Sequence, residues 1–171
     1  MTRALAYLGQ AGVYLLTALL LGSFSTWPAY RAFPEDQARL VVSFSHGADR
    51  KGACRKLTPE EIAEIAANMR KAEVCPRERL PIFLEITLSG DVLYQASVDP
   101  TGLAGDGASQ VYERFAVAPG RHRLRLRLRD SARETGFDYE REAEILLRPG
   151  QNFVADFRAE MGGFFFPGGE G

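Results

Sequence analysis

The two cysteines of the chain, Cys54 and Cys75, are the residues best suited to chemistry. They bracket the segment 55–74, and a bond between them in an oxidising compartment would close that loop and stabilise it by about 3 kcal/mol. The alternative is a copper site in which His46 and Met69 join both sulfurs, because imidazole, thioether and thiolate groups suit Cu(I). Metal sites normally contain closely spaced ligand pairs, and the sequence has no C-x-x-C. We therefore expect a disulfide and no metal or other cofactor, with copper binding as the alternative.

Motifs for catalysis are missing from the sequence. It contains no G-x-S-x-G, Walker, H-E-x-x-H or G-x-G-x-x-G pattern, and only two histidines. A Ser-His-Asp or Cys-His mechanism therefore has little support. We expect a protein that is not an enzyme and takes no small-molecule substrate.

Arginine occurs at every second position from Arg121 to Arg129. Alternation along a strand would place these side chains on one face, which by itself suggests an anion-binding surface. Glutamate alternates in the same way from Glu140 to Glu144, so a hairpin of the two segments would pair opposite charges. We favour this ladder of cross-strand ion pairs over an anion-binding site. The expected cross-strand pairs are Arg129 with Glu140, Arg127 with Glu142, and Arg125 with Glu144.

The charge balance supports internal pairing. The chain has 21 Lys and Arg residues against 22 Asp and Glu, a formal net charge of −1. No large positive field remains to attract nucleic acid, so we expect no nucleic-acid partner. The charges are unevenly distributed, because Arg3 is the only charged residue before Arg31.

The uncharged run from Ala4 to Phe24 is long enough to form a helix across a bilayer. Trp27, Pro28 and Tyr30 follow it, as in the aromatic belt at a membrane surface. A cleaved signal peptide is also apolar, but this segment lacks a convincing small-x-small cleavage site. We predict a retained N-terminal transmembrane helix in contact with the lipid bilayer.

The predicted anchor carries a stripe of polar and small residues. Their spacing places them along one face of a helix, where they could pack against another membrane helix. We therefore expect integral membrane protein subunits as partners. The alternative is that Tyr7 and Gln10 lie near the headgroups and that Thr17 bonds its own backbone. The stripe consists of Tyr7, Gln10, Tyr14, Thr17, Ala18 and Gly22.

Short segments of alternating apolar and polar residues recur after the anchor, separated by turns such as the Pro-Gly pairs at 119–120 and 149–150. The insertion 54–75 contains the N-cap, proline and acidic first turn of a short helix, at Thr58-Pro59-Glu60-Glu61. The pattern predicts a mainly β fold, an immunoglobulin-like or fibronectin-like sandwich of about seven strands with a helical insertion. The predicted strands span residues 40–45, 82–88, 92–98, 110–117, 122–129, 139–147 and 152–157.

Three consecutive phenylalanines, Phe164, Phe165 and Phe166, occur in a glycine-rich tail. Such a run is too apolar for a free tail. We expect these rings to contact a partner or lipid, and the alternative is that they dock on the chain's own domain.

The chain thus divides into an anchor at 1–31, a connector at 32–37, a sandwich domain at 38–158 and a tail at 159–171. Because the cysteines favour an oxidising compartment, we expect a single-pass protein of the bacterial inner membrane with its main domain in the periplasm. The expected function is that of a non-catalytic accessory subunit or assembly factor of a larger membrane complex, for example a respiratory or electron-transfer complex. The alternative is a periplasmic ligand- or copper-binding module.

Overall fold

The computed structural model describes residues 2–27 and 33–169, and the chain divides into two compact units after Pro34. The first unit contains one helix, α1 (Thr2–Thr26). Its stretch Arg3–Ser25 is long and apolar enough to cross a membrane. The helix predicted near the N-terminus is therefore present.

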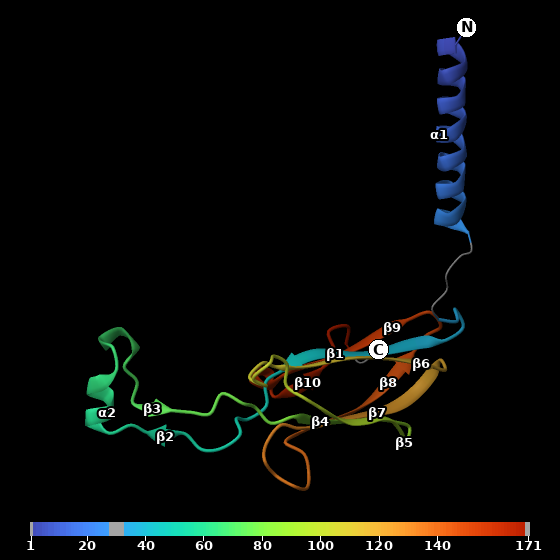
Figure 1. Cartoon of the computed structure of the whole chain (residues 1–171). Coiled ribbons are helices and arrows are strands. Elements are labelled where there is room, and N and C mark those ends of the chain that lie inside the picture. The colour runs from blue at the N-terminus through green and yellow to red at the C-terminus, as the bar shows by residue number, and fades with distance from the viewer. Residues whose placement is uncertain (1, 28–32, 170–171) are drawn as a thin grey trace. The chain divides into compact units, whose positions relative to one another are not determined.

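The second unit is built on eight strands in two four-stranded sheets (Figure 1). The strands are β1 (Ala38–His46), β4 (Ile82–Leu88), β5 (Asp91–Val98), β6 (Ser109–Val117), β7 (Gly120–Arg129), β8 (Tyr139–Leu147), β9 (Asn152–Arg158) and β10 (Gly163–Phe165). One sheet has the order β10-β9-β1-β6 and the other the order β5-β4-β7-β8. Neighbouring strands are antiparallel, except that β1 and β9 are parallel.

The structure confirms a mainly β domain that contains the seven expected strands. Its strand order differs from the immunoglobulin arrangement, in which the first two strands are neighbours in one sheet. Here β1 lies between β6 and β9, whereas the next sandwich strand, β4, belongs to the other sheet. The difference arises because the long segment 47–81 carries the chain from one sheet to the other.

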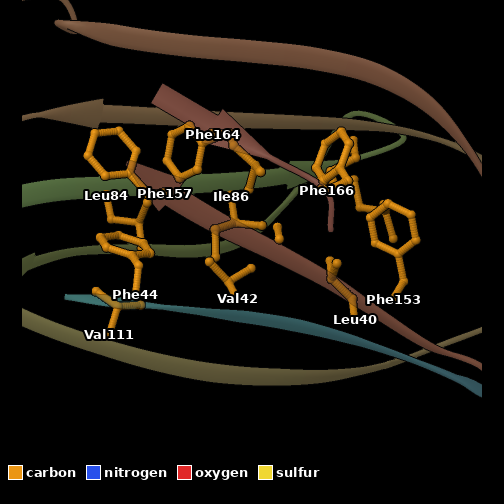
Figure 2. Packing of buried hydrophobic residues seen from close by; sticks show 14 of the residues in the cluster. Leu40, Val42, Phe44, Leu84, Ile86, Val111, Phe153, Phe157, Phe164 and Phe166 are labelled. Atoms are coloured by element: carbon orange, nitrogen blue, oxygen red, sulfur yellow. The ribbon is translucent and has the colours of Figure 1, made fainter. Parts of the chain in front are cut away.

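Alternate residues of both sheets enter one hydrophobic core (Figure 2). At one end of this core, the ring of Phe44 packs against Phe157, with centroids 5.4 Å apart, and against Phe164 at 6.0 Å. The alternation predicted from the sequence therefore places the apolar side of each strand correctly. The fully buried side chains include Leu40, Leu84, Ile86, Leu124, Leu126 and Leu128.

Two of the three tail phenylalanines belong to this core. β10 pairs with β9, with Phe164 opposite Phe157, and so extends the sheet beyond the expected domain end at residue 158. Phe164 is 5% exposed and Phe166 is 9% exposed. The prediction that they contact a partner or lipid is therefore wrong for these two rings, because pairing along the edge of β9 carries them inward. Phe165 is half-buried, and the guanidinium carbon of Arg158 lies 5.4 Å from its ring centroid.

Between β1 and β4 the chain forms an arm, defined here as residues 51–78, which extends from one end of the sandwich (Figure 1). Its elements are β2 (Arg55–Lys56), α2 (Pro59–Glu64), the 3-10 turn η1 (Ala67–Met69) and β3 (Glu73–Val74), with β2 paired to β3. The short helix expected in the insertion is thus present, but it ends at Glu64. A second 3-10 turn, η2 (Ala159–Met161), connects β9 to β10.

Candidate functional site

The arm is closed by a disulfide between Cys54 and Cys75, whose Cα atoms are 4.1 Å apart. The two cysteines lie across the β2–β3 ribbon, next to the paired residues Arg55 and Val74. The disulfide expected from the sequence is therefore confirmed. It joins the two strands of the arm at the side nearer to the sandwich.

The arm has regular secondary structure but no core of its own. No side chain from residue 49 to residue 81 is buried, and Met69 and Val74 are 67% and 38% exposed. Beyond the disulfide, the Leu57 N–H donates to the carbonyl of Ala72 at 2.9 Å, which extends the ribbon by one bond. The arm therefore presents apolar side chains to its surroundings instead of burying them.

A capping box begins α2 at the far end of the ribbon. The Glu61 carboxylate accepts the Thr58 N–H at 2.8 Å, and the Thr58 hydroxyl accepts the Glu61 N–H at 3.3 Å. Arg55 of β2 also donates to the Glu61 carboxylate at 2.9 Å. The hydrogen bond from the Thr58 backbone, followed by the bond from Arg55, lowers the pKa of Glu61 below its usual value. These contacts connect the short helix to the ribbon.

The base of the arm is held against the sandwich by Arg79. Its Nη1 donates to the carbonyl of Ala48 at 2.7 Å, and its Nε donates to the carbonyl of Asp106 at 3.2 Å. The Lys51 N–H donates to the carbonyl of Glu78 at 2.8 Å, so the entering and leaving strands are joined directly. The arm is therefore fixed at its base by bonds that do not depend on the disulfide.

The structure does not assemble the four residues of the copper alternative. The sulfurs of Cys54 and Cys75 are bonded to each other, and Met69 lies in the exposed turn η1. His46, at the end of β1, instead places Nε2 at 2.6 Å from a carboxylate oxygen of Asp130. Among the described His, Cys, Asp and Glu side chains, the group that is close enough to share a metal ion consists of the two sulfurs and Glu73. A carboxylate oxygen of Glu73 lies within 4.8 Å of both sulfurs.

His46 belongs to a half-buried polar cluster at the end of the sandwich where the arm begins. Its ring stacks edge-on against Phe157, with centroids 4.8 Å apart. Tyr139 packs beside them, and its pKa is raised by burial and then by the negative charges of Asp130 and Asp138. This cluster closes the end of the core, which gives His46 a structural role.

The arginine face of β7 is present, but its register against β8 differs from the expected one. The observed opposite pairs are Arg127 with Glu140, Arg125 with Glu142, and Arg123 with Glu144, two residues away from the predicted pairs Arg129–Glu140, Arg127–Glu142 and Arg125–Glu144. The loop sets this register, because the Asp138 carboxylate accepts the N–H groups of Asp130 at 3.0 Å and Ser131 at 3.2 Å. Tyr139 is thereby placed opposite Leu128. A shift of two residues leaves every side chain on the same face, so alternation alone could not detect it.

The ion pairs across β7 and β8 are exposed. Arg125 Nε donates to Glu140 at 2.8 Å, and Arg123 approaches Glu142 at 3.5 Å. Such pairs contribute about 0.2–1 kcal/mol each. They define which charges neutralise one another on this face, in agreement with a structural ladder.

Arg127 instead turns toward β4, where it bonds the buried carboxylate of Glu85. Its Nε donates to Oε1 at 2.9 Å, and Glu85 is only 6% exposed. Gln95 of β5 donates to the second oxygen at 3.3 Å. This pair could not be predicted from the sequence, because Glu85 is far from Arg127 along the chain and a single acidic residue in an apolar strand forms no pattern.

A hollow of about 520 Å³ opens on this face beside the turn between β4 and β5. The His122 Nε2 donates to the carbonyl of Ala118 at 2.8 Å, because a carbonyl can only accept, and Nδ1 lies 3.2 Å from the Ser89 hydroxyl. A serine nucleophile makes such a contact with its base, but here a carbonyl replaces the carboxylate that would orient the imidazole. Ser89 and Gly90 have φ of 53° and 100°, as the two central residues of a type I′ turn require. The contact between Ser89 and His122 therefore stabilises the β4–β5 hairpin.

The stripe of α1 is exposed along its length. Gln10 donates to the Tyr14 hydroxyl at 2.9 Å, and the Thr17 hydroxyl donates to the Val13 carbonyl at 2.9 Å. These polar groups find partners within the helix, which lowers the cost of placing them in lipid. Contact between the stripe and another membrane helix stays a prediction.

No protein-family model, no curated protein and no solved structure matches the chain.

Proposed function

We propose that this chain is a non-catalytic, single-span membrane protein that acts as an accessory subunit or assembly factor of a larger bacterial membrane complex. In this proposal α1 crosses the inner membrane, and the sandwich works in the periplasm as a scaffold that carries the arm. Its partners are integral membrane subunits, and it takes no substrate, nucleic acid or cofactor. The observation that carries the proposal is the disulfide-bonded arm, which has regular secondary structure although it buries no side chain.

The energetic cost of the arm supports a binding role for it. Ordering the backbone costs about 1–2 kcal/mol per residue, and a segment without buried side chains recovers little of this from the hydrophobic effect. The disulfide offsets part of the cost by restricting the unfolded loop. A segment ordered in advance loses less entropy when it binds, so the arrangement favours recognition more than it favours folding. The exposed Met69 and Val74 supply apolar contact area for that purpose.

The anchor and the disulfide support the membrane and the compartment parts of the proposal. α1 is apolar over the length needed to span a bilayer. A disulfide persists in the periplasm and is rare in the reducing cytosol. In this proposal the sandwich unit, which begins at Glu35, presents the arm on the oxidising side of the membrane.

The test is co-purification of the full chain in mild detergent, with two methionine variants as a matched pair. Met69 in the arm is 67% exposed and Met161 in η2 is 60% exposed, so either can become Asp without disturbing the core. We expect the wild type and Met161→Asp to retain the same stoichiometric membrane subunit, and Met69→Asp to lose it. Purification of the wild type as a lone monomer, or equal retention by both variants, would contradict the proposal.

A further inference from the structure

The disulfide of the arm occupies an accessible position. Cys54 is exposed and Cys75 is half-exposed, and neither belongs to the hydrophobic core. Disulfides inside a stable core resist reduction, whereas exposed ones exchange readily with thiols. We propose that Cys54–Cys75 is an exchangeable disulfide, reduced and re-formed by a dithiol protein in the same compartment. This inference is independent of the membrane complex proposed above, because it requires only an accessible bond.

Two charged side chains share the face of the ribbon that carries the sulfurs. Side chains alternate along strands, so Lys56 and Glu73, which are paired across the ribbon, emerge on the same side as the cysteines. A carboxylate oxygen of Glu73 lies within 4.8 Å of both sulfurs. Lys56 brings a positive charge to this face, and a positive charge beside a cysteine favours its thiolate. The Glu73 carboxylate opposes a thiolate on either cysteine, because it adds negative charge beside both sulfurs.

The exchange is balanced in two steps. A thiolate of the dithiol protein attacks Sγ of Cys54, the more exposed of the two residues, forming a mixed disulfide and releasing Cys75 as a thiolate that takes up a proton. The partner's second thiol then loses its proton and attacks the partner's first sulfur, which is bonded to Cys54 in the mixed disulfide. This step releases Cys54 as a thiolate and leaves the partner with a disulfide of its own. Two electrons pass from the partner to this chain, and the reverse sequence restores the bond.

Reduction would loosen the arm and leave the sandwich intact. The ribbon beyond the cysteines retains two paired positions, and α2 has only six residues, which is too short for an isolated helix to be stable. The base of the arm keeps the Lys51–Glu78 backbone bond and the Arg79 contacts, so both cysteines stay near each other. Exchange therefore switches the arm reversibly between an ordered and a loose form.

The experiment treats the full chain in detergent micelles with dithiothreitol at pH 7, in the presence of a chelator and without denaturant. The chain has only two cysteines, so every alkylated thiol reports this bond. We expect both thiols to be released while hydrogen exchange in the arm rises about tenfold or more and exchange in β1 and β4 stays unchanged. Oxidised glutathione should then restore the original pattern. Reduction only in denaturant, or loss of protection in the sandwich strands at the same time, would overturn the proposal.

Two variants test the influence of Glu73 on the exchange. We expect Glu73→Gln to speed re-formation of the disulfide several-fold at pH 7, because removing the negative charge beside the sulfurs raises the fraction of thiolate. Glu64→Gln, at the end of α2 and outside the group of atoms around the sulfurs, should re-oxidise at the wild-type rate. Equal rates for Glu73→Gln and the wild type would remove Glu73 from the mechanism. Alanine at both cysteines gives the exchange pattern of an unbridged arm for comparison.

Discussion

Arg127→Ala removes the guanidinium that neutralises the buried carboxylate of Glu85. Glu85 is 6% exposed, and its Oε1 accepts the Arg127 Nε at 2.9 Å. The guanidinium carbon also lies 4.3 Å from the ring centroid of Phe137, which shields the pair. After the substitution, the donors that the described residues still offer this carboxylate are neutral, namely the Gln95 amide at 3.3 Å and the Thr87 hydroxyl at 3.4 Å.

The expected loss follows from the burial of the two partners. Removing one member of a buried ion pair costs about 3–5 kcal/mol, because a charge is left without compensation. The Arg127 side chain is 25% exposed and two donors remain on Glu85, which places the loss near the lower limit, at about 3 kcal/mol. Arg125→Ala is the matched control on the same strand and face. Its side chain is 39% exposed and that of Glu140 is 43% exposed, so we expect a loss of about 1 kcal/mol or less.

Urea denaturation of the full chain in detergent micelles measures both losses, with the far-ultraviolet signal of the sheets as the probe. The result predicted is a much lower midpoint for Arg127→Ala than for Arg125→Ala. Adding Glu85→Gln to Arg127→Ala should recover part of the loss, since the orphaned charge is gone. Equal midpoints for the two single variants would refute the reasoning from burial.

Three further predictions concern the core, the loop and the register. Phe164→Ala should cost about 3–5 kcal/mol in urea denaturation, because the ring is 5% exposed, whereas the half-buried Phe165→Ala should cost about 1 kcal/mol; equal losses would contradict the docking of the tail. Burial alone would raise the pKa of Asp138, but hydrogen bonds from Ser131 and Asp130 and the charge of Arg133 lower it. Its stabilising effect is therefore present above the ordinary Asp value of about 3.9 and is lost as the pH falls through the lowered pKa, so the stability advantage of the wild type over Asp138→Asn should shrink below about pH 4, and a constant advantage would exclude this role. Arg125→Glu should be rescued by Glu140→Arg and not by Glu144→Arg in a double-mutant cycle, with a coupling of about 0.2–1 kcal/mol; rescue by Glu144→Arg alone would restore the register expected from the sequence.

Alternation made the strands and their buried faces predictable. The apolar positions of β7 and β8 repeat every second residue, and the structure buries Leu124, Leu126 and Leu128 as this pattern requires. The disulfide was also predictable, because the chain has only two cysteines and they bracket one segment. The N-cap residue Thr58, the proline after it and the acidic first turn likewise indicated where α2 begins.

Features that depend on distant contacts were not predictable. The register of β7 against β8 is set by the Asp138 carboxylate in the loop, whose hydrogen bonds leave no trace in the alternation. The order of the sheets depends on where the segment 47–81 delivers the chain, which composition does not reveal. The tail phenylalanines have the composition of an exposed interaction motif, and only the edge of β9 shows that Phe164 and Phe166 belong inside.

The central claim is that the arm joins this chain to a larger membrane assembly. The most direct test is the mass of the detergent-solubilised particle that contains the chain, measured for the wild type and for a variant whose residues 53–76 are replaced by a short Gly-Ser linker. The base contacts of Lys51 and Arg79 remain in that variant, so the sandwich should fold normally. We expect a particle much heavier than one chain for the wild type and a particle with the mass of one chain for the variant. A lone wild-type chain, or the same heavy particle in both cases, would contradict it.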